Sequence, residues 1–157
     1  MVIKLRTNAQ NKDFIQLVRQ LDSGLKITDG DDHSFYDQYN QLEEINHVVV
    51  FYKDKIALGC GAIKPYNSTT MEIKRMFTSP ASRGKGIATM ILSELENWAT
   101  ELAFEKCILE TGAHMLEAVG LYHKNGYSLI PNYGPYIGVQ TSKCFEKEIV
   151  GNLNGEY

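Results

Sequence analysis

TMEIKRMFTSPASRGKGIATMILSELENWATEL, residues 70–102, is the stretch that decides the fold of this 157-residue chain. Residues 71–78 read as a strand, and Pro80 ends it because proline has no amide hydrogen for a ladder. Residues 81–86 carry no bulky apolar side chain. Apolar residues then recur at steps of three and four, which predicts a long helix with one buried face and with Glu96 mostly on the solvent side. That face comprises Ile87, Ala88, Ile91, Leu92, Leu95, Trp98, Ala99 and Leu102.

The loop between this strand and this helix has the composition of an anion site. Gly84 and Gly86 let the backbone approach a ligand closely. The first helical turn leaves four amide N–H groups unpaired, and the helix dipole makes that end positive. Arg83 and Lys85 add two full charges. Together these features indicate a phosphate or pyrophosphate site, with a glycine-softened helix start and two solvated cations as the structural alternative.

Two common phosphate-binding patterns do not fit this loop. A P-loop needs Lys-Ser/Thr after its last glycine, whereas Gly86 is followed by Ile87. The dinucleotide pattern needs a third glycine where Thr89 stands. Arg83-x-x-Gly86-x-Ala88 does fit another pattern: it resembles the Arg/Gln-x-x-Gly-x-Gly/Ala signature of the GNAT superfamily of acyl-CoA N-acyltransferases.

Composition bounds the class of protein. The length suits a single domain over residues 1–150, followed by a polar tail over residues 151–157. A net charge of -3 without a basic block argues against a nucleic-acid partner. Three well-separated cysteines and four scattered histidines favour a reducing compartment and argue against a metal site. The longest apolar run, residues 48–52, is strand-sized, so we expect a cytoplasmic protein with no membrane segment.

The remaining patterns predict a mixed order of strands and helices, an α/β (α+β) arrangement. A helix carries Phe14, Leu17, Val18 and Leu21 on one face, and Ser23-Gly24 is expected to end it. A hairpin turns at residues 53–55, where Gly59 in the return strand suggests small-residue packing or a bulge. Strands are expected at residues 2–6, 47–52, 56–63, 107–110, 127–130 and 143–150, and further helices near residues 35–39 and over residues 115–124.

Residues 118–127, AVGLYHKNGY, look like the second GNAT signature, Ala-x-x-Leu-Tyr-x-x-x-Gly-Phe/Tyr. The resemblance covers about residues 2–149, and runs at residues 109–112, 130–134 and 144–147 look like small bacterial members of unassigned substrate. It implies the GNAT acyl-CoA N-acyltransferase fold. In that fold a mixed, mostly antiparallel sheet of about six or seven strands is flanked by about four helices, with a V-shaped splay between the fourth and fifth strands.

The resemblance also implies a cosubstrate, acetyl-CoA, held in that splay. The backbones of Met76, Phe77 and Thr78 would hydrogen-bond the pantetheine amides as an added strand does. Arg83 holds the first signature position and is a further cofactor-binding candidate, with a role that is also partly structural. Met115 departs from the pattern, because many members carry an asparagine there that touches the cofactor. The pyrophosphate would accept hydrogen bonds from the backbone amides of Gly84, Lys85, Gly86, Ile87 and Ala88.

Two side chains are the catalytic candidates for moving acetyl to a primary amine of a small molecule or peptide. Glu72 stands where histone-type members place a base, with a water chain, or a structural pairing with Lys74 or Arg75, as the alternatives. Tyr122 is the candidate acid for the departing sulfur, with plain aromatic packing as its alternative.

Tyr133 and Tyr136, in the loop over residues 131–142, are expected to line the acceptor end, with an ordinary crossover loop as the alternative. Acidic residues between positions 29 and 44 could draw a cationic amine, or form a solvated helix entrance. Cys60 and Cys144 read as core residues.

Two other functions remain open at this stage: a non-catalytic coenzyme A sensor or interaction module with the same fold, and, more weakly, a nucleotide-binding oxidoreductase. Small members of the family often pair, so the resemblance leaves a homodimer open.

Overall fold

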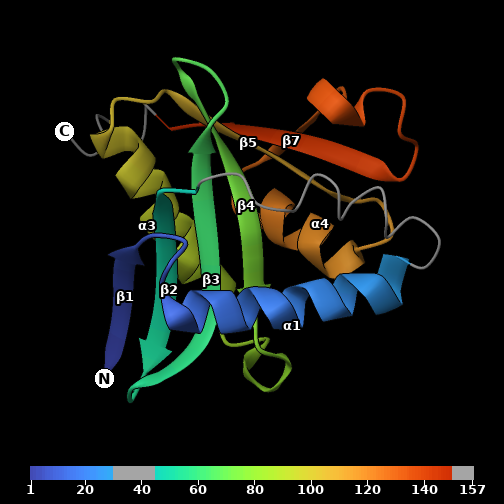
Figure 1. Cartoon of the computed structure of the whole chain (residues 1–157). Helices are drawn as coiled ribbons and strands as arrows, with labels where there is room; N and C mark the ends of the chain where they lie inside the picture. The colour runs from blue at the N-terminus through green and yellow to red at the C-terminus, as the bar shows by residue number, and fades with distance from the viewer. Residues whose placement is uncertain (30–44, 150–157) are drawn as a thin grey trace. The chain divides into compact units, whose positions relative to one another are not determined.

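The structure is a computed structural model that describes residues 1–29 and 45–149. Seven strands form one sheet in the order β1-β2-β3-β4-β5-β7-β6 (Figure 1). The chain divides into two compact units, residues 1–62 with 75–94 and residues 63–74 with 95–157. Strands β3 (Ile56–Pro65) and β4 (Thr70–Thr78) and helix α3 (Ile87–Glu101) each contribute residues to both units.

The first unit begins with the strand predicted at residues 2–6 and with the predicted hairpin. Strand β1 (Val2–Thr7) pairs antiparallel with β2 (His47–Lys53) and stands at the end of the strand order. Asp54 and Lys55 join β2 to β3 with φ angles of 52° and 71°. Two successive positive φ angles are typical of the two-residue turn whose twist matches a hairpin, so the predicted turn is confirmed.

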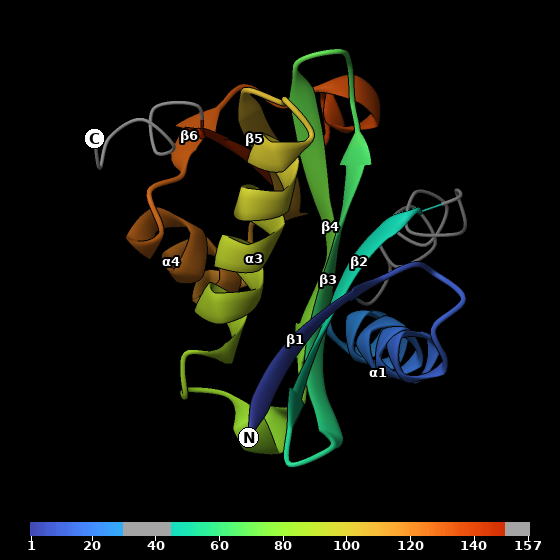
Figure 2. The same ribbon diagram turned by 90° about the vertical axis from the view of Figure 1, so that its left-hand side faces the viewer.

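Helix α1 (Lys12–Asp29) and the first half of α3 cover opposite faces of the first three strands (Figure 2). The prediction that Ser23-Gly24 ends the first helix is wrong, because α1 continues to Asp29. One glycine inside a helix costs only about 1 kcal/mol, which the packing of an apolar face readily exceeds. The buried cluster of this unit comprises Phe14, Leu17, Ile45, Val48, Val50, Cys60, Ala62 and Phe77.

Gly59 provides the small-residue packing that the sequence suggested. A β-carbon at this position would lie 2.9 Å from Cδ1 of Ile91 and 2.9 Å from the carbonyl oxygen of Phe77. Because real β-carbons essentially never approach that closely, α3 sits against β3 only where the side chain is a hydrogen.

We therefore expect Gly59→Ala to lower the free energy of unfolding by about 1–3 kcal/mol through overpacking. Gly120→Ala is the matched control: it lies in a helix, a β-carbon there would meet nothing within 4 Å, and the change should stabilise by about 0.5–1 kcal/mol. Urea unfolding of the two variants measures both values, and an equal response would contradict the packing argument.

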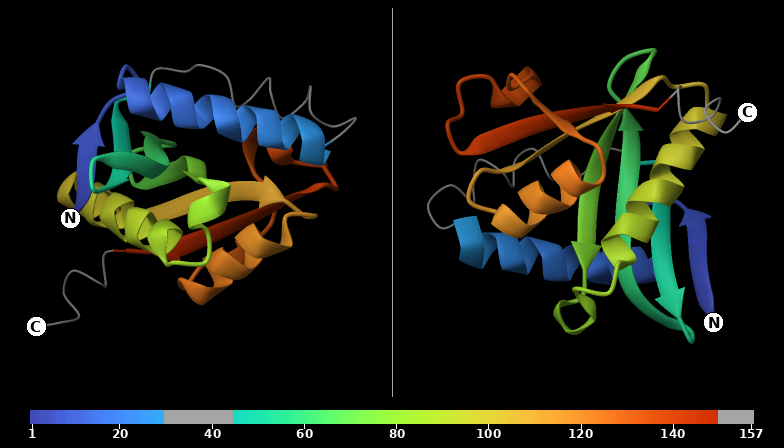
Figure 3. Two further views of the ribbon diagram at one scale, coloured as in Figure 1. Left: turned by 90° about the horizontal axis from the view of Figure 1, so that it is seen from below. Right: turned by 180° about the vertical axis from the view of Figure 1, so that it is seen from behind.

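The second unit is built on β5 (Lys106–Gly112), which pairs antiparallel with β7 (Ser142–Glu148) along its whole length. Strand β6 (Ser128–Ile130) pairs with the other side of β7. Helix α4 (Leu116–Lys124) lies beside β5 and β7 (Figure 3). The predicted strand over residues 107–110 is therefore too short, because pairing of Gly112 with Ser142 carries it onward.

The predicted fold class is confirmed. Strands β4 and β5 are parallel, whereas β1–β2, β5–β7 and β6–β7 are antiparallel. The parallel register ends with Glu72 opposite Ile108, although β4 continues to Thr78, as a splay between these strands requires. Among the described residues there are three α-helices rather than about four, and the helix predicted near residues 35–39 lies outside them.

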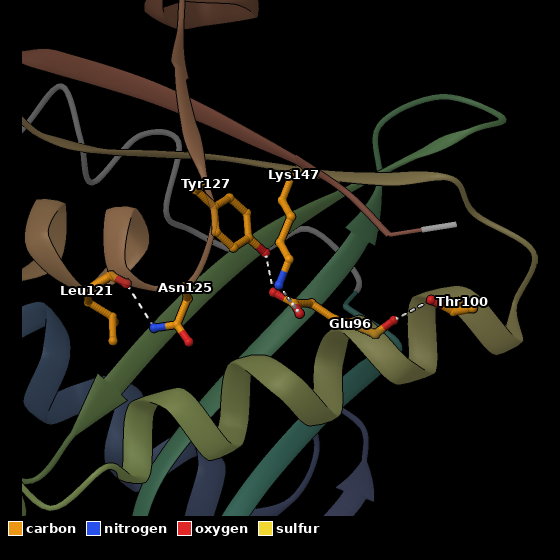
Figure 4. A network of polar contacts seen from close by, with 6 residues as sticks. All are labelled: Glu96, Thr100, Leu121, Asn125, Tyr127 and Lys147. Atoms are coloured by element: carbon orange, nitrogen blue, oxygen red, sulfur yellow. Dashed lines mark hydrogen bonds and ion pairs between the residues drawn. The ribbon is translucent and has the colours of Figure 1, made fainter. Parts of the chain in front are cut away.

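One position on α3 and the residue that follows the helix correct the predicted helical face. Glu96 is only 9% exposed, although its place in the pattern predicted the solvent side. Its carboxylate accepts hydrogen bonds from the hydroxyl of Tyr127 at 2.9 Å and from Nζ of Lys147 at 2.8 Å (Figure 4). Leu102, predicted on the buried face, is 38% exposed because the helix ends at Glu101. The buried residues of this unit include Met71, Ile73, Leu95, Ala99, Cys107, Leu109, Phe145 and Ile149.

Candidate functional site

The glycines of the loop before α3 have the conformation that an anion-binding turn requires. Gly84 and Gly86 have φ angles of 78° and 81°, in the left-handed region that other residues rarely adopt. A β-carbon at either glycine would meet no atom within 4 Å. The glycines are therefore needed for the backbone conformation, and the space in front of them is open.

The same loop presents a run of amide groups. The first hydrogen bond of α3 runs from the amide of Met90 to the carbonyl of Gly86, at 3.1 Å. Within the part of the chain that the structure describes, five consecutive amide N–H groups have no acceptor. They can serve an anion at the positive end of a helix. These amides belong to Gly84, Lys85, Gly86, Ile87 and Ala88.

Arg83 plays the structural role that the sequence left open. Its Nε donates a 2.9 Å hydrogen bond to the carbonyl of Thr78, and its guanidinium lies 5.6 Å from the ring centre of Phe77. The side chain thus ties the loop to the end of β4. One of the backbone groups predicted to meet pantetheine, the Thr78 carbonyl, is already used by this bond.

Strand β4 contains a backbone irregularity that the sequence did not predict. Arg75 has a φ angle of 60°, which is uncommon for a residue with a side chain. Its Nη1 contacts Oδ1 of Asp22 at 3.2 Å, and the thiol of Cys60 donates to its carbonyl at 3.4 Å. Arg75 therefore has an ion-pair partner on α1. Burial raises the pKa of Cys60 to about 12, in keeping with a core residue.

The carboxylate of Glu72, in the second unit, lies among polar neighbours. Glu72 is 9% exposed, and its Oε2 accepts a 2.7 Å hydrogen bond from the hydroxyl of Tyr133. Its Oε1 lies 3.8 Å from Nζ of Lys74. The alternative pairing with Lys74 is thus present as an ion pair, and Tyr133 is a partner that sequence spacing could not indicate.

The loop after β6 holds Tyr133 in place. The Tyr133 ring packs edge-on against Tyr66 and Tyr136, with ring centres 5.2 Å and 5.6 Å away. Nδ2 of Asn132 donates to the carbonyls of Tyr136, Val139 and Ser142 at 3.0–3.1 Å. The sequence analysis did not identify Asn132, because the carbonyls that accept its hydrogen bonds come near it only when the loop folds back.

Register brings a second carboxylate to the face of the sheet that carries Glu72. Glu72 is opposite Ile108 on β5, and Glu110, two residues on, is opposite Cys144 on β7. Directly paired residues share a face, so both carboxylates and Cys144 lie on one side. The hydroxyl of Ser142 donates to Oε2 of Glu110 at 2.7 Å. Burial, with Glu110 and Glu72, raises the pKa of Cys144 to about 11, so this thiol is no ready nucleophile.

Tyr122 lies on α4 and is 6% exposed. Its ring packs against Tyr127 and Phe145, with ring centres 5.7 Å and 6.2 Å away. Burial, and then the charge of Glu110, raises the pKa of Tyr122, so the hydroxyl keeps its proton at neutral pH. Among residues 1–29 and 45–149 this hydroxyl has no hydrogen-bond partner, which is a costly state for a buried donor and suits one that serves a ligand.

Other kinds of site are not found in the described residues. They contain no group of three or more His, Cys, Asp or Glu side chains that could hold a metal ion. None of the helices described is long and apolar enough to cross a membrane. Met115, which replaces the asparagine of the family pattern, directly precedes α4. Its carbonyl accepts a hydrogen bond from the amide of Val119 at 3.0 Å.

Known proteins resemble this chain over most of its length. The sequence profile described as the acetyltransferase (GNAT) family matches residues 15–127. The uncharacterized N-acetyltransferase YjgM of Escherichia coli is 30% identical over 140 residues, covering 82% of this chain and 83% of that protein. The IAA acetyltransferase of Azospirillum brasilense is 28% identical over 137 residues, covering 86% and 90%.

Solved structures agree with the sequence relatives. A Klebsiella pneumoniae protein assigned to the acyl-CoA N-acyltransferases superposes with a TM-score of 0.77 at 25% identity, covering 95% of this chain and 97% of that one. A GNAT family acetyltransferase from Elizabethkingia anophelis with acetyl-CoA bound has a TM-score of 0.68 at 18% identity, covering 94% and 97%, which shows the shared fold.

Proposed function

Because this chain belongs to the acetyltransferase (GNAT) family, whose enzymes are acetyl-CoA-dependent N-acetyltransferases, we propose that it transfers acetyl directly to a primary amine of a small molecule or peptide. In this proposal Glu72 is the general base and Tyr122 the general acid. A C–N bond forms at the acetyl carbon as the C–S bond breaks. Of the two protons that the nitrogen loses, one leaves through Glu72 to water. The other proton passes to Tyr122, which has given its own proton to the sulfur of coenzyme A.

The observation that carries the proposal is the loop before α3. Five consecutive amides and two left-handed glycines lie at the N-terminus of a 15-residue helix, and a β-carbon at either glycine would meet no atom within 4 Å. This arrangement supplies donors, positive potential and close backbone approach together, which is the chemistry that a pyrophosphate needs. We propose the same five amides as the pyrophosphate ligands, and the backbones of Met76, Phe77 and Thr78 as the pantetheine ligands.

Gly86→Glu tests this loop. The change places a carboxylate in the proposed anion site, so we expect the Kd for coenzyme A, measured by calorimetry, to rise about tenfold or more. Gly138→Glu is the control for backbone strain, because Gly138 has a φ angle of 80° and equally open surroundings. It should leave coenzyme A affinity unchanged. Equal affinities in the two variants would remove the loop from the proposed site.

One contact favours a second candidate, a coenzyme A sensor that keeps the fold without turnover. Lys74 lies 3.8 Å from Oε1 of Glu72, and an ion pair is what a purely structural carboxylate would make. A thiol-release assay over amines, amino acids, polyamines and peptides separates the two functions. Acetyl-CoA-dependent release with any acceptor supports the enzyme, and tight coenzyme A binding without release supports the sensor.

We also propose that residues 1–150 act as one domain in the cytoplasm of a bacterium, with pairing into a homodimer as an option. The shared strands β3 and β4 and helix α3 support a single domain, since each contributes to both compact units. The three free, buried cysteines suit a reducing compartment. Size-exclusion chromatography with light scattering decides the oligomeric state.

A further inference from the structure

The hydrogen bond between Tyr133 and Glu72 has a defined direction. Burial, and then the Glu72 carboxylate, raises the pKa of Tyr133, so the phenol keeps its proton and is the donor. The oxygen–oxygen distance of 2.7 Å is typical of an O–H donor on a carboxylate. The bond therefore runs from the phenol to the carboxylate, and Oε2 is the oxygen of Glu72 that it occupies.

The donor is also rigidly placed. The Tyr133 ring lies between Tyr66 and Tyr136, and the three bonds from Asn132 close the loop around it. A side chain held by packing and by a fixed loop transfers that order to the group it bonds. Tyr133 thereby fixes the rotation of the Glu72 carboxylate.

The two oxygens of Glu72 are consequently not equivalent. Oε2 is occupied by the Tyr133 hydroxyl, whereas Oε1 faces Nζ of Lys74 at 3.8 Å, beyond hydrogen-bond distance. In the described part of the chain, Oε1 accepts no hydrogen bond. Among the described residues, the titratable groups on this face of the sheet and around it include Lys64 on β3, Lys74 on β4, Glu110 on β5, Cys144 on β7 and Tyr133 in the loop.

We propose that Tyr133 is a positioning residue that holds Oε2 of Glu72 and leaves Oε1 to take the proton from the acceptor ammonium. The inference rests on the proposed function, in which Glu72 is the base. Tyr133 touches no reacting atom in this role, and its contribution is the orientation of a carboxylate. The loop over residues 131–142 then positions the catalytic base, in addition to being a candidate surface for the acceptor.

Tyr133→Phe tests the role, because it removes the hydroxyl and keeps the ring between its two neighbours. We expect kcat at neutral pH to fall about tenfold, with the KM for the acceptor changed by less than about twofold, because the lost hydroxyl orients the carboxylate and touches no substrate. We also expect the Kd for coenzyme A to stay unchanged. A variant that was merely less stable would bind less coenzyme A per molecule as its activity fell.

Tyr66→Phe is the matched control. It removes a hydroxyl from the neighbouring ring without touching the Glu72 carboxylate, and it should keep kcat within about twofold of the native value. Tyr133→Phe added to Glu72→Gln should lower kcat no further. An unchanged kcat in Tyr133→Phe, or an equal fall in Tyr66→Phe, overturns the assignment.

A second readout does not depend on turnover. In protein labelled with ¹³C at the glutamate carboxyl carbon, the signal missing from Glu72→Gln identifies Glu72. Its chemical shift at neutral pH should change in Tyr133→Phe, which removes the hydrogen bond to the carboxylate, and stay in place in Tyr66→Phe. If the native protein releases no thiol with any acceptor, the proposed function fails while this signal still tests the Tyr133–Glu72 link. An unmoved signal rejects the link even in an active enzyme.

Discussion

Replacing Tyr122 by phenylalanine is expected to lower kcat about 100-fold and to leave the melting temperature equal or slightly higher. The loss follows from the proposed role, because the phenol is the group that gives a proton to the departing sulfur. The preserved stability follows from the structure, since this buried hydroxyl bonds to nothing in the described residues and the ring contacts with Tyr127 and Phe145 remain.

Steady-state kinetics and a thermal melt of the same preparation check both halves of this expectation. The Kd for coenzyme A, from calorimetry, should change by less than about twofold if the hydroxyl acts only in the transition state. Unchanged kcat would remove Tyr122 from the mechanism. A large fall in melting temperature would show instead that the hydroxyl has a structural partner.

Glu96→Ala is expected to lower the free energy of unfolding by about 3 kcal/mol, or the melting temperature by roughly 10 °C. The Glu96 side chain is 12% exposed and that of its partner Lys147 is 21% exposed. Removing the carboxylate leaves the Lys147 ammonium and the buried Tyr127 hydroxyl without their acceptor. A partly buried cation and an unsatisfied donor are both costly.

Glu94→Ala is the matched control, two residues earlier on the same helix. Glu94 also contacts two cations, Arg6 at 2.7 Å and Lys4 at 3.7 Å, but these partners are 30% and 39% exposed. Surface pairs of this kind contribute about 1 kcal/mol or less. Adding Lys147→Met to Glu96→Ala should restore part of the stability, because the stranded charge is then removed. Equal losses for Glu94→Ala and Glu96→Ala would contradict the burial argument.

Local signals were sufficient for much of the fold and for one part of the site. A strand, two glycines, two cations and a helical stripe lie within residues 70–102, so the loop before α3 could be predicted from neighbours in sequence. The hairpin at Asp54 and Lys55 follows the same logic, since its conformation depends on a few adjacent residues. The second signature located Tyr122, although its buried and unpartnered hydroxyl became visible only in the folded chain.

The sequence by itself therefore determined the family, the fold class and the place of the glycine loop before α3, because each follows from patterns of residues close together in the chain. Only the tertiary structure decided the partners of the ionisable side chains. Glu72 and its partner Tyr133 are 61 positions apart in the sequence. Arg75 and Asp22 are 53 positions apart, and Glu96 and Lys147 are 51 positions apart. A charged residue carries no mark of its distant partner, so whether it faces solvent, an ion pair or a hydrogen-bonded hydroxyl depends on strand register and helix packing.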